Sequence, residues 1–366
     1  MNIQTRHEIQ IVNQIINSMT EVIKTILVKS LILVFVFLFL TCQNNETEKP
    51  NDEDCYSLSD VVPTSPYNSP VWHPTGEFIG FNHTKLNSIT YTHFPGSNAC
   101  SIEQHFDMDS SGFWLVRPDG SGMKRILSHP LYEPAWSPDG QWIAFESNFK
   151  IYKMRFDVNQ QLFDETSITQ LTFEGICFSP SWRSDGQQIA YERSFSYPES
   201  DSVQGTWVME TDGTLLQKVA NGSMPNWMST TDLLYTGLYT EIYRATISDS
   251  VKRSQLTFLN KNDPYFSYNL YPQYSLASNK IAFYSIRTSE KPGIWLFDTT
   301  NVGLSKLSTG SVDADFGIPF TWNPSGNEIV YTSYYSDDWS YINGTLWIID
   351  IHTGQKRQIT FNVKPN

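Results

Sequence analysis

Charge is scarce in this sequence, and positive charge is scarcer than negative charge. Charged residues make up 17% of the 366 residues, and 25 Lys and Arg stand against 38 Asp and Glu, for a formal net charge of -13. An acidic surface repels phosphate backbones, so nucleic acid is not an expected partner. The chain is still expected to fold, because aromatic residues reach 14% and supply apolar surface to bury.

Cysteine is also rare, and the common catalytic motifs are missing. The four cysteines, Cys42, Cys55, Cys100 and Cys177, form no C-x-x-C pair, so a thiolate zinc site is not indicated. Neither H-E-x-x-H, nor a phosphate-binding glycine loop, nor a G-x-S-x-G elbow is present. The sequence therefore predicts no cofactor, no metal and no catalytic residue. A disulfide between Cys55 and Cys100 is possible, since both lie outside the repeat strands described below.

The one strongly apolar run lies near the N-terminus and is short. Residues 31–40 read LILVFVFLFL, follow Lys24 and Lys29, and precede Cys42. A bilayer span needs about 20 residues, so this run fits a secretory signal better than a membrane helix. Cysteine directly after the cut is what a bacterial lipoprotein signal requires, because its thiol accepts the lipid. We expect residues 1–41 to be a signal peptide and Cys42 to be lipidated.

The signal departs from the usual pattern in two ways. The segment before Cys42 resembles a lipobox, but Phe39 stands where Leu, Val or Ile is usual. Met19 would give a more typical start than Met1, and an ordinary signal peptide or an uncleaved anchor remains the alternative.

Residues 42–67 are polar and acidic at first, which predicts a flexible tether. No Asp follows Cys42, so an outer-membrane address in the cell envelope, facing the periplasm or the surface, is expected.

A single pattern recurs six times in the remaining chain. The string PAWSPDGQWIAFES begins at Pro134, and related strings begin at Pro70, Pro180 and Phe320. Two degraded copies begin at Pro225 and Pro272. The aromatic residues that anchor the copies are Trp72, Trp136, Trp182, Trp227, Tyr274 and Trp322. Only the first interval is long, which predicts an insertion in the first copy.

Each copy predicts four antiparallel strands. Pro-Asp-Gly favours a tight turn, and the following I-A-F segment alternates with a period of two, as in a strand with one buried face. A second half-repeat adds a strand, a D-x-x-G turn and a last short strand. One such sheet cannot bury both its faces, so the copies must stack, and radial stacking predicts a six-bladed β-propeller of all-β class over residues 68–361, with a tail at 362–366. The anchoring tryptophans should pack between neighbouring blades.

The W-S-P-D-G-x-x-I-A-F pattern resembles the TolB-type β-propeller, whose repeat is related to the WD repeat. The resemblance covers nearly all of the expected mature chain and implies the fold alone. It does not extend to TolB itself, which carries an α/β domain before its propeller, whereas only the short tether precedes the first copy here. Similar propellers precede the catalytic domain of prolyl oligopeptidase-type peptidases, but we expect no such domain here, since the residues after 361 are few and no G-x-S-x-G elbow occurs.

The expected long loops gather on one face. Turns after the first and third strands of each copy are short, whereas the long connections are 82–112, 192–204, 258–272, 309–319 and 332–343. Loops on one face of a repeat scaffold often bind ligands. Exposed aromatic rings beside carboxylates suit sugars or peptides, and the candidates for ligand binding are Tyr197, Tyr265, Tyr268, Asp313, Asp315, Tyr334, Tyr335 and Trp339.

The insertion in the first copy contains His83, His93 and His105 beside Asp107 and Asp109. Imidazole and carboxylate suit several divalent ions, but the spacing matches no known metal motif, so core or surface roles are preferred.

Two functions compete. The first is a monomeric binding or scaffold protein, held at the membrane by its lipid and binding a protein or glycan of the cell envelope. The second is a carbohydrate-active enzyme, a lyase or hydrolase, with its site at the channel mouth. Lyases that resemble this propeller use histidines and a metal in the channel, whereas the histidines here cluster in one insertion, which counts against the enzyme.

Overall fold

The structure is a computed structural model that describes residues 67–93, 100–194, 201–237, 240–258, 268–287, 290–307, 316–333 and 344–361. All of them belong to one compact unit, Cys55–Asn366. Among them, no helix is long and apolar enough to cross a membrane. The expected signal peptide, Cys42 and the C-terminal tail lie outside the described residues.

Twenty-four strands and one short 3-10 helix, η2 (Asp201–Val203), are described. In chain order the strands are β1 (Tyr67–Trp72), β2 (Ile79–His93), β3 (Cys100–Val116), β4 (Lys124–Leu127), β5 (Tyr132–Trp136), β6 (Trp142–Ser147), β7 (Lys150–Asp157), β8 (Leu162–Gln170), β9 (Ile176–Trp182), β10 (Gln188–Ser194), β11 (Gly205–Glu210), β12 (Gln217–Ala220), β13 (Ser223–Trp227), β14 (Asp232–Thr236), β15 (Ile242–Ile247), β16 (Val251–Gln255), β17 (Tyr268–Ser275), β18 (Lys280–Arg287), β19 (Glu290–Asp298), β20 (Gly303–Lys306), β21 (Phe316–Trp322), β22 (Glu328–Ser333), β23 (Thr345–Asp350) and β24 (Lys356–Gln358).

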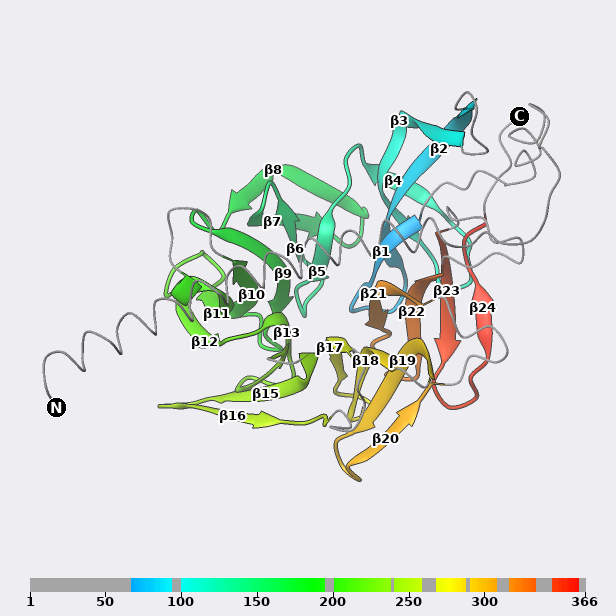
Figure 1. The fold of residues 1–366 in the computed structure, drawn as a ribbon. Coiled ribbons are helices and arrows are strands. Elements are labelled where there is room, and N and C mark those ends of the chain that lie inside the picture. Colours follow the sequence, from blue (N-terminus) through cyan, green and yellow to red (C-terminus); the bar gives the residue numbers. More distant parts are fainter. Residues whose placement is uncertain are drawn as a thin grey trace, which may run out of the picture. The chain divides into compact units, whose positions relative to one another are not determined.

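The strands form six four-stranded antiparallel sheets, each made of four consecutive strands. Figure 1 shows the sheets arranged around a common centre, with β1, β5, β9, β13, β17 and β21 innermost. This is the predicted six-bladed β-propeller, and the first strand of every copy lines its centre. The first blade begins at Tyr67, one residue before the boundary that the sequence predicted.

The Pro-Asp-Gly turns form as their residue types predict. In the second blade Gly140 donates its N–H to the Ser137 carbonyl at 2.8 Å, and its φ of 69° favours glycine. Asp139 accepts hydrogen bonds from the Ser137 hydroxyl and from the Gln141 N–H. The equivalent turns of neighbouring blades are in contact, because a Cβ on Gly140 would come within 2.5 Å of the His73 ring. These short turns therefore lie together on one face.

The anchoring tryptophans pack between blades, as predicted. Trp136 lies in an apolar cluster with Val71 and Phe113 of the preceding blade. Trp182 donates its indole N–H to the carbonyl oxygen of Ala135 in the second blade at 3.0 Å. The repeat thus encodes its own inter-blade contact, and these rings are structural.

The ring closes by packing between the sixth and first blades rather than by exchange of a strand. Trp72 of β1 donates its backbone N–H to the Thr321 hydroxyl of β21 at 3.0 Å, and the Tyr67 N–H donates to the carbonyl of Gly344 at 3.1 Å. Trp72 also packs with Val330 in one buried cluster. Hydrogen bonds of this kind recur around the ring, since the Trp227 N–H donates to the Ser181 hydroxyl.

The insertion in the first copy is not a loop, which corrects the sequence-based expectation. Strands β2 and β3 continue past the blade as one hairpin, with His83 opposite Gly112 and His93 opposite Cys100. From Ile89 to His93 apolar or aromatic residues alternate with threonine, and that alternation favours a two-stranded ribbon.

Candidate functional site

The six innermost strands share a backbone irregularity at the same position of the repeat. Each loses register with its neighbouring strand just before the anchoring aromatic residue. In five blades the residue three places before that aromatic has a left-handed φ close to 50°, and these residues are Ser69, Glu133, Ser179, Met224 and Tyr271. A proline follows each of them and disfavours the right-handed helical conformation there. Such bulges re-aim side chains, here on the channel wall.

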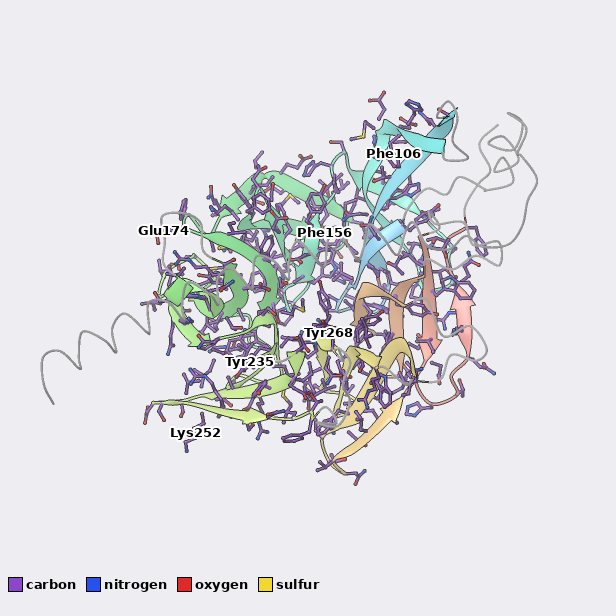
Figure 2. All side chains as sticks on the ribbon, in the orientation of Figure 1. Phe106, Phe156, Glu174, Tyr235, Lys252 and Tyr268 are labelled. Carbon is purple, nitrogen blue, oxygen red and sulfur yellow. The ribbon has the colours of Figure 1, made fainter. Side chains whose placement is uncertain are left out.

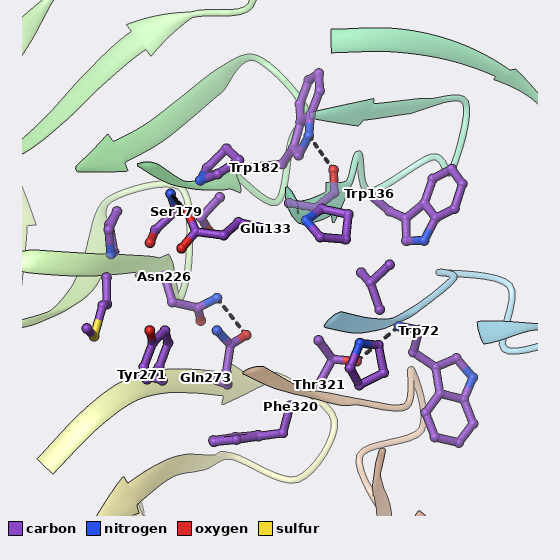
Figure 3. A pocket seen from close by; sticks show the side chains of 18 of the residues that line it. Trp72, Glu133, Trp136, Ser179, Trp182, Asn226, Tyr271, Gln273, Phe320 and Thr321 are labelled. Atoms are coloured by element: carbon purple, nitrogen blue, oxygen red, sulfur yellow. Dashed lines mark hydrogen bonds between the residues drawn. The ribbon is translucent and has the colours of Figure 1, made fainter. Parts of the chain in front are cut away.

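These bulges surround a channel of about 270 Å³ at the centre of the propeller. It is lined by residues from all six innermost strands, including the ring edges of Pro70, Pro134, Pro180 and Pro225. Figure 3 shows Glu133 of the second blade and Tyr271 and Gln273 of the fifth blade directed toward the open space between the strands. Five of the six blades contribute the same left-handed backbone to the wall, so the differences among these blades lie in their side chains.

Two carboxylates lie at the channel: Glu133 is one of its lining residues, and Glu192 lies beside it, close enough for its charge to raise the pKa of the lining residue Tyr271. Glu133 of β5 accepts a hydrogen bond from the backbone N–H of Ser179 in the next blade. Glu192 of β10 accepts one from the backbone N–H of Met224, again in the next blade, at 3.3 Å. Neither carboxylate has a Lys or Arg partner within the described part of the chain. Both oxygens are therefore positioned by neutral donors, and their negative charge is not compensated.

The electrostatics of the cluster follow from burial and from like charge. Burial raises the pKa of Glu133, hydrogen bonds from the backbone N–H and the hydroxyl of Ser179 partly offset this, and the charge of Glu146 raises the pKa further. Burial likewise raises the pKa of Glu192, and the neighbouring charge of Glu133 adds to the effect. Burial, followed by the charges of Glu133 and Glu192, raises the pKa of Tyr271 to about 12. The Tyr271 hydroxyl thus remains a hydrogen-bond donor beside two carboxylates.

Another part of the channel wall is polar but neutral. The Asn226 amide donates to the Gln273 side-chain oxygen at 3.1 Å, and its own oxygen accepts the backbone N–H of Tyr274 at 2.9 Å. These bonds join the fourth blade to the fifth and hold both amides in place. The channel therefore presents carboxylate acceptors together with fixed amides, which suits a ligand rich in hydrogen-bond donors and positive charge.

Most residues predicted for ligand binding cannot be compared with this channel. Tyr197, Tyr265, Asp313, Asp315, Tyr334, Tyr335 and Trp339 lie outside the described residues. Tyr268 is described, but it begins strand β17 opposite Ile286 instead of lying in a loop, and it is not among the residues that line the channel.

Two of the three predicted histidines, His83 and His105, have described side chains, and these lie in different environments. His83 is buried and stacks on Tyr67, with ring centroids 4.1 Å apart, whereas His105 is exposed and pairs with Ser88 on the extended hairpin. Asp107 accepts the Ser110 hydroxyl at 2.5 Å and pairs with Lys85, so it stabilises a local turn. Among the described residues no group of three or more His, Cys, Asp or Glu could hold a metal ion.

The remaining cysteine of the repeats is structural. Cys177 is fully buried and donates its thiol to the carbonyl oxygen of Glu174 at 3.4 Å. The proposed Cys55–Cys100 disulfide lies outside the described side chains.

Sequence reasoning missed Glu133, Glu192 and Tyr271, although a signal for two of them is present. Glu133 and Tyr271 occupy the position just before the Pro of the repeat, a position whose residue type varies from copy to copy. A repeat position that keeps its backbone geometry but changes its side chain is a natural place for specificity. The constant residues of the motif predict only the scaffold.

The fold and the channel together define the class of the protein: a six-bladed β-propeller of TolB type with an acidic, partly buried central channel. Comparison with protein-family models and with curated proteins finds no match.

Solved structures carry the likeness. TolB from Acinetobacter baumannii is similar with a TM-score of 0.54 at 18% identity, over 68% of this chain and 59% of that one. A putative TolB from Agrobacterium tumefaciens gives 0.51 at 20% identity, over 65% and 84%. A puromycin-hydrolyzing peptidase of Mycobacterium tuberculosis gives 0.53 at 11%, over 85% and 55%. At these identities the likeness shows the fold alone.

Proposed function

We propose that this protein is a monomeric, lipid-anchored binding protein of the cell envelope, whose propeller channel holds a positively charged segment of a partner protein. The observation that carries the proposal is the pair Glu133 and Glu192, which lie close enough to repel each other and have only neutral hydrogen-bond donors as partners among the described residues. A carboxylate pair of this kind costs free energy unless a cation compensates it. A ligand cation would supply that compensation.

The chemistry favours a protein partner over a neutral glycan. A guanidinium or ammonium group can donate to both carboxylates, and the apolar stem of Arg or Lys can lie against the proline rings that line the wall. Tyr271 offers a ring face to the same group. A channel of about 270 Å³ has room for one or two side chains, so an inserted loop or terminus fits better than a folded domain.

The location rests on the N-terminal sequence. The apolar run 31–40 and Cys42 support an outer-membrane lipoprotein, with residues between Cys42 and the first blade as a tether. Such an anchor holds the propeller near a membrane surface where envelope proteins are concentrated.

The proposal is tested with a matched pair of small probes. N-acetylarginine amide carries the cation, and N-acetylcitrulline amide has nearly the same shape without the charge. Titration calorimetry should detect saturable binding of the arginine probe and none of the citrulline probe. The double variant Glu133→Gln, Glu192→Gln should lose that binding, whereas Glu165→Gln, on the exposed outer strand β8, should keep it.

Two results would count against the proposal. Equal binding of both probes would mean that charge does not matter, and undiminished binding by the double variant would place the site elsewhere.

The partner itself can be sought with a photo-crosslinking residue at Met224 in the channel, with exposed Leu215 as the control position. Release of cleaved products from mixed oligosaccharides by the purified protein would instead favour the carbohydrate-active alternative.

A further inference from the structure

A second hollow, separate from the channel, lies where the third blade meets the fourth. Its volume is about 390 Å³, within the range of about 300–1,000 Å³ typical of ligand sites. Strand β12 and the residue after it contribute one wall, and strands β14, β15 and β16 contribute the other. The residues that carry the argument are Lys218, Asn221, Tyr235, Gly237, Tyr243 and Arg253.

Two cations face this groove, and backbone carbonyls hold both of them. Lys218 donates its ammonium to the carbonyl oxygen of Ser202 at 2.7 Å. Arg253 donates two guanidinium N–H groups to the carbonyl oxygen of Val219, at 2.9 and 2.5 Å. No carboxylate pairs with either side chain within the part of the chain that the structure describes. A neutral acceptor fixes the position of a cation without cancelling its charge.

The two positive charges also act on each other. Burial lowers the pKa of Lys218, and the charge of Arg253 lowers it further, so the two groups are close enough to repel. This arrangement is unexpected in a protein with a net charge of -13, in which carboxylates are plentiful. Two adjacent cations held by neutral groups leave room for an anion that is not part of the chain.

Aromatic rings build the rest of the groove. The rings of Tyr235 and Tyr243 stack with centroids 5.5 Å apart and an interplanar angle of 20°. Tyr235 is buried and Tyr243 is half-buried, so the second ring offers part of its surface to a ligand. A Cβ on Gly237 would come 2.4 Å from the Tyr243 ring, so a glycine is needed for that ring to lie where it does.

We propose that this groove binds an oxyanion, a carboxylate or a phosphate, carried on a small polar ligand of about the size of one sugar ring. Lys218 and Arg253 bind the anionic oxygens, the planar guanidinium being suited to a two-oxygen contact. Tyr243 and Asn221 meet the neutral part of the ligand. The inference does not rest on the channel function, because it concerns other residues and the opposite charge.

Three probes on one sugar scaffold test the proposal and distinguish a carboxylate ligand from a phosphate ligand. Glucuronate carries a carboxylate, glucose 6-phosphate carries a phosphate, and glucose carries neither. With the full mature chain, calorimetry or ligand-observed NMR should show saturable binding in the millimolar range for at least one charged probe and none for glucose. The stronger of the two charged probes identifies the oxyanion.

The variants decide whether the groove is responsible. Lys218→Gln and Arg253→Gln should each weaken binding by about tenfold or more, the effect of losing one charge-assisted hydrogen bond. Lys218→Arg keeps the charge and should keep most of the affinity. Lys252→Gln is the matched control, because it removes the same charge from the neighbouring position of β16, whose side chain points to the other face of the strand. Figure 2 labels Lys252 and Tyr235, which lie to either side of strands β15 and β16 in that view.

Four outcomes would overturn the proposal: no binding of either charged probe, equal binding of glucose, undiminished binding by both glutamine variants, or an equal loss in Lys252→Gln. The last would show that the general field of the surface, rather than the groove, attracts the anion. Both glutamine variants are expected to fold, because Arg253 is exposed and Lys218 is only half-buried. A circular dichroism melt of each variant checks this before binding is measured.

Discussion

The side chain of Asn82 joins the first blade to the second, and its replacement should weaken the whole propeller. Asn82 is buried on β2, donates its amide to the Leu131 carbonyl at 2.7 Å, and accepts the Leu131 N–H at 2.9 Å. Leu131 is fully buried, so its backbone has no water to replace these bonds. The variant Asn82→Leu keeps a similar volume but removes both partners.

The magnitude follows from the two backbone groups left without partners. Each buried unsatisfied group costs about 1–3 kcal/mol, so Asn82→Leu should cost about 2–6 kcal/mol. That is a large part of the roughly 5–15 kcal/mol by which folded domains are stable. At about 2 °C per kcal/mol, a value suited to large domains, the Tm should fall by roughly 4–12 °C. Thermal melts followed by near-UV circular dichroism measure the change, with exposed Asn159→Leu as the control.

A second substitution at the same position sharpens the test. Asn82→Asp keeps the acceptor for the Leu131 N–H but places an anionic oxygen against the Leu131 carbonyl. Protonation restores a donor, so this variant should be destabilised at pH 7 and recover relative to the wild type as the pH falls. A Tm for Asn82→Leu within about 1 °C of the wild type, well inside the scatter of surface substitutions, would refute the inter-blade role.

Three further predictions concern the channel, the response to pH and the anchor. Glu133→Gln should raise the Tm of the free protein at pH 7, because it removes a partly buried charge whose pKa is raised, while it weakens binding of the arginine probe; a lower Tm would contradict this. Hydrogen bonds within their turns lower the pKa of Asp212 and Asp350 below 3.8, so these groups contribute stability that is lost as the pH falls below that value. The raised pKa values of Glu133 and Glu192 act in the opposite sense. The stability that these two groups contribute is complete below pH 4.5 and is lost as the pH rises through their raised pKa values. Urea denaturation should therefore give maximal stability under mildly acidic conditions. Cys42→Ala should release the protein from membranes in a fractionation experiment, and unchanged membrane association would contradict lipidation.

The sequence predicts the fold well because each of the local features that indicate it occurs in every copy of the repeat. Turn chemistry, strand alternation and the anchoring aromatic occur together six times, so chance agreement in one copy does not matter. Trp136 and Trp182 contact the preceding blade as the repeat implies. The hairpin formed by β2 and β3 was missed because its outer part lies outside the repeat. In that outer part, only the alternation of residue types could indicate a two-stranded ribbon instead of a loop.

The channel residues could not be predicted in the same way. The repeat locates Glu133 just before a proline, but only the structure shows that this position is a left-handed bulge on the innermost strand. Glu192 comes from the second strand of its blade, and its proximity to Glu133 depends on the packing of two blades. Loop length predicted a binding site on one face of the propeller, whereas Glu133 lies in the channel and Lys218 and Arg253 lie in the groove beside β12.

The geometry of the channel wall separates what belongs to the scaffold from what belongs to binding. The left-handed bulge recurs in five blades with residues as different as Ser179 and Tyr271, so the bulge itself is a property of the repeat. Negative charge at that position occurs in one blade only, at Glu133. Backbone strain and charge can therefore be varied independently. Ser179→Gly relieves a left-handed conformation that costs about 1–2 kcal/mol, less about 0.5–1 kcal/mol for the greater chain entropy of glycine. It removes the hydroxyl that bonds Glu133 but keeps the backbone N–H that donates to the same carboxylate. It should raise stability by up to about 1 kcal/mol in urea denaturation and leave binding of the arginine probe unchanged. If Ser179→Gly instead abolished binding, the conformation of the bulge, and not the charge of Glu133, would be the feature that recognises the ligand.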